Sequence, residues 1–179
     1  GLALAASGRS SAAAHAFEQA ARAERADEPT RTGRLRRAAE HALRAGDLVH
    51  GRRLLDEVLA RHRLPRPEAP SACLAWVLLE RARLSLRGLE LAAPEAVDAA
   101  LAAERIDAAA AVGIGLSVVD SVRAAAYQSM ALRLALDAGD VVRAQRAFAF
   151  AACFNANAGL RDAERTDRLL DRARSLAAR

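Results

Sequence analysis

The sequence contains no lysine, and this absence limits the chemistry it can carry. All 27 positively charged residues are arginine. The lysines that phosphate-binding loops, protein kinases and Schiff-base enzymes need are therefore missing from these 179 residues. The chain also lacks a kinase HRD or DFG motif and the G-x-S-x-G turn of serine hydrolases. We therefore expect no catalytic residues, no enzyme activity and no cofactor in this chain.

Cysteine and long apolar runs are also scarce. Cys73 and Cys153 have no Cys or His at zinc-ligand spacing, so we expect two buried free thiols in a reducing compartment. The longest uncharged stretch, 147–160, is too short to span a membrane, and no signal peptide is visible. These features predict a soluble cytoplasmic protein with no membrane partner. Because the chain opens on Gly1, in what reads as mid-helix, we also expect a piece of a larger protein.

The residues that are present favour helices. Apolar residues make up 53% of the chain but aromatic residues only 3%, and Ala, Leu and Arg dominate. Ala, Leu and Arg have high helix propensity, whereas β-branched and aromatic residues favour strands. We predict an all-α fold of about eight or nine helices, stacked as antiparallel pairs. The clearest predicted helices cover 10–25, 29–45, 47–64, 71–89, 94–112, 117–138, 141–156 and 160–178.

Three local features shape this prediction. The segment 64–70, with its prolines, is expected to link sub-units 1–64 and 69–179 of one domain, 1–179. The helix over 71–89 is apolar nearly all round, which predicts burial on every side. Gly113 and Gly115 are expected to end one helix, with Ser117 or Asp120 capping the next.

Three glycine turns repeat the same residue pattern. Gly8, Gly46 and Gly139 can each end a helix in the left-handed conformation, and an aspartate follows the last two. The positions five, nine and twelve residues after each glycine are small, bulky, and small or medium. They are Ala13, Phe17 and Ala20; Gly51, Leu55 and Val58; and Ala144, Phe148 and Ala151.

This spacing resembles the tetratricopeptide repeat (TPR), in which paired helices stack because neither pair can bury its apolar face alone. The first helix of each pair departs from that pattern: four residues before the turn glycine a TPR favours a large aromatic residue or Leu, and this chain has Leu4, Ala42 and Ala135. The resemblance implies that the first helix of each pair lines a concave binding surface. The residues it places there, as candidates for contact with a protein or peptide partner, are Arg34, Arg37, Arg123, Tyr127, Gln128 and Arg133.

A second resemblance concerns the parent protein. The segments Leu35–Asp47, Arg81–Leu89 and Gly113–Asp120 are similar to a C-terminal region of large bacterial signalling proteins, as in myxobacteria. Those proteins join a serine/threonine kinase domain, an ATPase domain and a TPR-like tail. The resemblance implies a non-catalytic regulatory scaffold whose partner is a protein, a peptide or another domain of the same parent chain.

Other motifs have simpler interpretations. Gly113-x-Gly115 lacks the third glycine and the preceding strand of a dinucleotide loop, so a helix–helix turn is the better interpretation. His15 and Glu18 lie three residues apart on one predicted helix and could both face a metal ion. Two ligands are too few for a site, and we therefore predict no metal.

The segment 31–66 carries ten arginines and leaves an alternative function open. Such a strip could bind phosphate, nucleic acid or an acidic peptide. No aromatic residue lies among these arginines for base stacking, so a solvated helix face is favoured and we do not expect nucleic acid as a partner. The alternative is an effector-sensing helical arm of an ATPase-type transcription regulator, with a closed apolar pocket near Trp76 and Cys73 or a DNA-contacting arginine strip.

Overall fold

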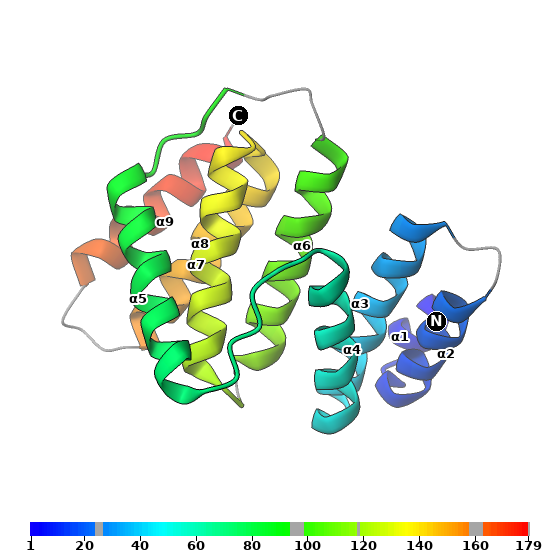
Figure 1. Cartoon of the computed structure of the whole chain (residues 1–179). Helices are drawn as coiled ribbons and strands as arrows, with labels where there is room; N and C mark the ends of the chain where they lie inside the picture. Colours follow the sequence, from blue (N-terminus) through cyan, green and yellow to red (C-terminus); the bar gives the residue numbers. More distant parts are fainter. Residues whose placement is uncertain (24–26, 94–98, 118, 158–162, 179) are drawn as a thin grey trace. The chain divides into compact units, whose positions relative to one another are not determined.

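The computed structural model describes residues 1–23, 27–93, 99–117, 119–157 and 163–178 (Figure 1). Within these ranges the chain forms nine α-helices and no β-strand, which confirms the predicted all-α fold of paired helices. The chain divides into two compact units, Gly1–Arg66 and Pro67–Arg179. Their boundary lies inside the segment 64–70 that was expected to be a linker.

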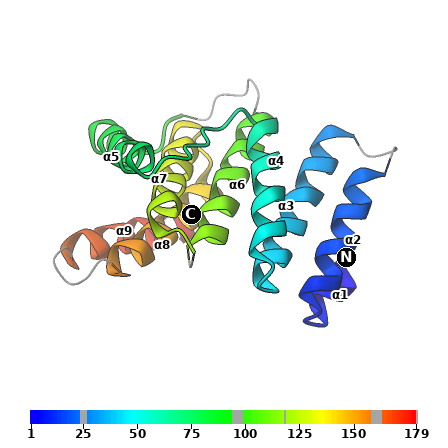
Figure 2. The same ribbon diagram turned by 60° about the horizontal axis from the view of Figure 1, so that its bottom comes forward.

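The unit Gly1–Arg66 contains four helices, each packed against the next along the chain. They are α1 (Leu2–Ala6), α2 (Ser10–Arg22), α3 (Glu28–Arg44) and α4 (Leu48–Arg61), and Figure 2 shows them side by side. Alanine at the contacts allows the helices to approach closely. The buried apolar side chains between them include Ala13, Phe17, Ala21, Leu35, Ala38, Ala39, Ala42, Leu54, Leu55 and Val58.

The unit Pro67–Arg179 is organised around one central helix. Its helices are α5 (Pro70–Arg87), α6 (Ala99–Leu116), α7 (Ser121–Asp137), α8 (Val141–Asn157) and α9 (Ala163–Ala177). Helix α7 packs against α5, α6 and α8, and α9 packs against α8 (Figure 1). Because α5 packs against α7, two helices further along the chain, this unit is not a simple series of sequential pairs. None of the described helices combines the length and apolar character needed to cross a membrane.

The three glycine turns have the same backbone geometry. Gly8, Gly46 and Gly139 all have positive φ angles, of 74°, 84° and 64°. In each turn the glycine N–H donates to the carbonyl three residues before it, and the next residue donates to the carbonyl five residues before itself. This pair of bonds is the Schellman motif, in which a left-handed residue satisfies the last carbonyls of a helix. The predicted turns are therefore confirmed.

The positions that follow each glycine pack as the repeated pattern predicts. The small residues Ala13 and Ala144 are fully buried, and the bulky residues Phe17 and Phe148 are 6% and 1% exposed. At Gly51, an added Cβ would lie 2.6 Å from Cγ of Leu43, so the helix pair α3–α4 is in direct contact there. Small residues at this position thus allow the two helices of a pair to touch.

The expected break at Gly113 and Gly115 is wrong, because α6 continues through both glycines to Leu116. The reason lies in packing. A Cβ added at Gly113 would lie 2.8 Å from Nε2 of Gln128, a clash that glycine avoids. Gly113 thus allows the close approach of α6 and α7, and Asp120 caps α7 by accepting from the N–H of Arg123.

Two burial predictions are also wrong. Helix α5 is not buried on every side, since Leu74, Leu78 and Leu86 are 53%, 66% and 90% exposed. Among the described helices its main neighbour is α7, which covers one face of it. Cys73 is buried as expected, but Cys153 is exposed, and both thiols are free. The expected helix starts at Pro94 and Leu160 lie outside the described residues.

Candidate functional site

The unit Pro67–Arg179 contains a cleft of about 600 Å³. Its lining residues come from α5, α7, α8 and α9. Helix α7 packs against α5 and α8, and α8 packs against α9, so the four helices form a series with α5 and α9 at its ends. Helices α7 and α8 therefore form the floor of the cleft, and α5 and α9 form its sides.

The body of the cleft is apolar. It is lined by Leu84 and Leu89 from the α5 side, Leu132 from α7, Phe154 from α8 and Leu169 from α9. Leu84, Leu132 and Leu169 belong to the same buried core cluster. Their packing holds the floor in place, which is what a preformed binding site requires.

The charged residues of the cleft are all of one sign. Arg81 on α5 and Arg165 and Arg168 on α9 line it, and within the described ranges no Asp or Glu does. Arg168 has one weak ion pair, at 3.7 Å from Glu164 on its own helix, and its side chain is 64% exposed. An apolar body with only positive charge around it favours a ligand that carries both apolar and acidic groups.

Gln128 is a buried polar residue among those that line the cleft. Its side chain is 2% exposed, and neither Nε2 nor Oε1 makes a hydrogen bond to the described part of the protein. A buried amide without partners costs roughly 1–3 kcal/mol per group. Both amide atoms are covered by the protein, and Nε2 lies toward Gly113 of α6, which is not among the lining residues, so the amide packs between α7 and α6.

Other polar groups in the cleft are already hydrogen-bonded within the protein. The Ser129 hydroxyl donates to the carbonyl of Ala125 at 2.9 Å. The Asn155 amide donates to the Thr166 hydroxyl at 2.8 Å and so ties α8 to α9. These bonds fix two of the polar side chains that line the cleft.

Two of the residues proposed for partner contact lie in the other unit, where both make contacts within the chain. Arg34 donates to the carbonyl of Ala20 at 2.7 Å and so joins α3 to α2. The guanidinium of Arg37 lies 5.9 Å from the ring centroid of Phe17, a cation–π distance. Both positions stabilise the contact between α2 and α3.

Arg133 has a structural partner that the sequence did not reveal. Its Nε lies 3.0 Å from Oε2 of Glu80, which is only 1% exposed, and its Nη1 lies 3.3 Å from Asp137. Arg83 pairs with the other oxygen of Glu80 at 2.8 Å. The two arginines compensate a buried carboxylate between α5 and α7, so Arg133 is better assigned to the fold than to a partner surface.

Tyr127 and Arg123, two further candidates on α7, also make contacts within the chain. Tyr127 is 1% exposed and packs edge-on against Trp76 at 4.7 Å, so it belongs to the core. Arg123 pairs with Asp120 at 3.3 Å and reaches the carbonyl of Glu68. Of the six residues proposed from the sequence, Gln128 is the one that lines the cleft.

Sequence reasoning missed Arg81, Arg165 and Arg168. They lie on helices that match no repeat, and their grouping depends on how α5 and α9 flank α7 and α8. The expected pocket near Trp76 and Cys73 differs from this cleft, which neither residue lines. One signal was present in the sequence, because α9 carries its arginines at 165 and 168 on one helical face.

No protein-family model, no curated protein and no solved structure matches the chain.

Proposed function

We propose that the chain is a non-catalytic protein-interaction module and that its cleft binds a peptide segment carrying apolar and acidic side chains. The observation that carries this proposal is the composition of the cleft, whose described lining combines an apolar floor with three arginines and no carboxylate. Apolar contacts supply affinity, while surrounding charges select the partner and speed its association. In keeping with the resemblance noted in the sequence, we place the module in a larger bacterial signalling protein.

The arrangement of the cleft supports a peptide rather than a purely apolar ligand. Its floor is formed by α7 and α8, and its arginines lie on α5 and α9. A segment lying over α7 could therefore place apolar side chains against the floor and acidic side chains near the arginines. Such recognition of a peptide in a groove between helices follows the general logic of helix-lined binding sites.

A display experiment tests this proposal. Random peptides shown on phage are selected on the wild-type chain, on the variant Arg81→Glu/Arg168→Glu, and on the control Arg9→Glu/Arg52→Glu. All four arginines are exposed, and Arg9 and Arg52 lie in the unit Gly1–Arg66, so both variants change the net charge equally without disturbing a core.

We expect the wild type and the control to enrich the same peptides, rich in Glu or Asp together with Leu or Phe. Synthetic copies should bind the cleft variant at least tenfold more weakly, which corresponds to about 1.4 kcal/mol. If the control variant Arg9→Glu/Arg52→Glu bound these peptides equally weakly, the attraction would come from the net charge of the chain and not from the cleft. Failure to enrich any peptide above background would contradict the proposal outright.

The absence of catalysis is part of the proposal and has its own test. The purified chain is incubated with ATP and with a generic protein substrate, and phosphate release and transfer are measured. We expect rates equal to those of buffer alone. A rate above buffer that disappears on unfolding the chain would contradict the non-catalytic assignment.

The alternative function, an effector-sensing arm, is favoured by one observation. The cleft volume of about 600 Å³ falls within the range of small-molecule sites, roughly 300–1,000 Å³. A screen of small carboxylates for thermal stabilisation distinguishes the two, since a small effector should stabilise the wild type without any peptide. The DNA-binding version predicts steeply salt-dependent binding, and a titration that detects no binding at low salt removes it.

A further inference from the structure

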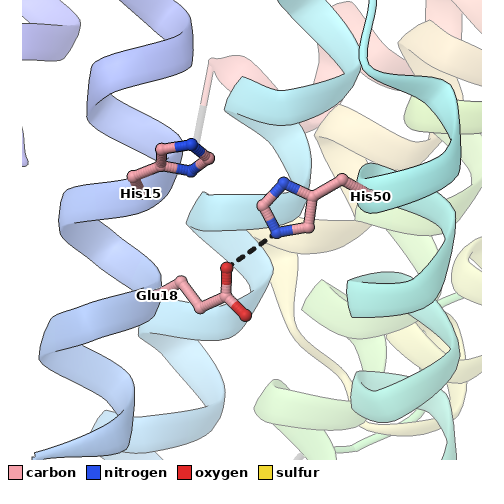
Figure 3. Close-up of side chains that lie close together, drawn as sticks. All are labelled: His15, Glu18 and His50. Atoms are coloured by element: carbon pink, nitrogen blue, oxygen red, sulfur yellow. Dashed lines mark hydrogen bonds and ion pairs between the residues drawn. The ribbon is translucent and has the colours of Figure 1, made fainter.

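A cluster of potential metal ligands lies in the unit Gly1–Arg66. His15 and Glu18 are on α2 and His50 is on α4, and Figure 3 shows the three side chains meeting between these helices. One ligand atom from each residue lies within 4.8 Å of the other two. The sequence placed His15 and Glu18 on one face but could not supply the third ligand, which is 32 residues further on.

The cluster already has close internal contacts. Nε2 of His50 lies 2.7 Å from Oε2 of Glu18, and the rings of His15 and His50 have their centroids 5.5 Å apart. Helix α3 packs against both α2 and α4 and so fixes their separation. Two imidazoles and a carboxylate thus converge from two rigidly held helices.

We infer that His15, Glu18 and His50 form a binding site for a transition-metal dication of the Zn²⁺ class. Two imidazole nitrogens and one carboxylate oxygen are ligands that Zn²⁺ favours, and a fourth position remains for water. Hard cations such as Mg²⁺ prefer oxygen ligands and are excluded by the two imidazoles.

The geometry needs only a small adjustment. Zinc–ligand bonds of about 2.0–2.1 Å place tetrahedral ligand atoms roughly 3.3–3.5 Å apart. His15 is exposed and can swing inward. The metal ion would take the place of the proton shared by His50 and Glu18, and that proton leaves to solvent as the ion binds.

Surrounding side chains prepare the ligands for this role. Nδ1 of His50 lies 3.6 Å from a carboxylate oxygen of Asp47, so its Nε2 is the nitrogen directed at Glu18. A carboxylate behind a histidine is a common way to orient a metal ligand. Asp47 is itself held in place because it caps α4 by accepting from the N–H of His50.

The nearby arginines do not block the site. Arg22 and Arg53 donate to Oε1 of Glu18, at 2.8 and 2.7 Å, and leave Oε2 for a metal. Oε2 of Glu18 thus stays directed at His50, where the ion would lie.

Calorimetric titration of the full chain with ZnCl₂ tests the inference. Two variants each remove one ligand: His15→Ala acts at an exposed position, and His50→Gln keeps a donor toward Glu18. The control His41→Gln removes a histidine of the same unit from outside the ligand set. A parallel titration with CoCl₂ reads the coordination number from the visible absorption bands of Co²⁺.

We expect one equivalent of Zn²⁺ to bind the wild type and the control with equal affinity, and each ligand variant to bind at least tenfold more weakly. Co²⁺ should give the intense bands of a four-coordinate site, and MgCl₂ should give no heat of binding. Absence of Zn²⁺ binding to the wild type, or equal binding by the ligand variants, would overturn the assignment. Because the cluster and the cleft lie in different units, this result is independent of the peptide proposal.

Discussion

Alanine at position 113 should have opposite effects on stability depending on the residue at position 128. Gly113 lies inside α6, and its backbone has no positive φ, so alanine suits the helix there. The obstacle is the buried side chain of Gln128. A Cβ at position 113 would lie 2.8 Å from its Nε2 and 2.9 Å from its Cγ.

The magnitudes follow from two opposing effects. Glycine to alanine inside a helix stabilises by about 1 kcal/mol. Overpacking a well-filled contact costs about 1–3 kcal/mol, and Gln128, at 2% exposure, has little room to move. Gly113→Ala alone should therefore destabilise by about 0–2 kcal/mol, but in a Gln128→Ala background it should stabilise by about 1 kcal/mol.

Urea unfolding of the four proteins in this mutant cycle measures the effect. Trp76 is the only tryptophan, and it packs against Tyr127 beside Gln128, so its fluorescence reports unfolding of this unit. The expected coupling energy is about 1–3 kcal/mol. If Gly113→Ala changes the free energy of unfolding equally in both backgrounds, the close approach of α6 and α7 at this point is refuted.

Three further predictions concern the packing and charges of the fold. Arg133→Met should lower the free energy of unfolding by about 2–3 kcal/mol, because buried Glu80 keeps only one of its arginine partners, and a urea titration followed by Trp76 fluorescence checks this. Gly46→Ala should destabilise by about 1–2 kcal/mol in thermal melts because its φ is +84°, whereas Gly33→Ala, in mid-helix with open space, should stabilise by up to about 1 kcal/mol. The pKa of Glu18 is lowered to about 2 in the folded chain, so its ionised carboxylate should add about 1–2 kcal/mol to the free energy of unfolding. This stabilisation should be complete above pH 4.5 and be lost as the pH falls toward 2. An acid titration in which Glu18→Gln follows the same curve as the wild type would contradict that assignment.

The sequence predicts the repeated turns well because their determinants are local. A glycine that must adopt positive φ, followed by an aspartate that caps the next helix, is visible in a few consecutive residues at Gly46 and Gly139. The small and bulky positions after each glycine follow from the helical period and are buried as expected at Ala144 and Phe148.

Local patterns fail where a distant side chain decides the outcome. Gly113 has the sequence appearance of a helix breaker, but it serves a contact with Gln128, and only the packing of α6 on α7 reveals that. The apolar face of α5 likewise reads as a buried helix, yet Leu78 and Leu86 remain exposed because its main described neighbour, α7, covers one side.

The candidate sites could be predicted only in part for the same reason. Gln128 was identified from its place on the first helix of a pair. Arg81 and Arg168 lie far apart in the sequence, on α5 and α9, and both line the cleft only because the chain folds. His50 joins His15 and Glu18 across 32 residues. Residues brought together by the tertiary packing of several helices leave no fixed spacing in the sequence.

Hydrogen exchange with and without a selected acidic, apolar peptide tests the central claim most directly. At saturating peptide, amide exchange should slow in the segments that line the cleft, at 81–89 and in the parts of α7, α8 and α9 that face it. The variant Arg81→Glu/Arg168→Glu should show no slowing at the same peptide concentration. Slowing confined to the unit Gly1–Arg66, or equal slowing in the variant, would contradict a binding site in the cleft.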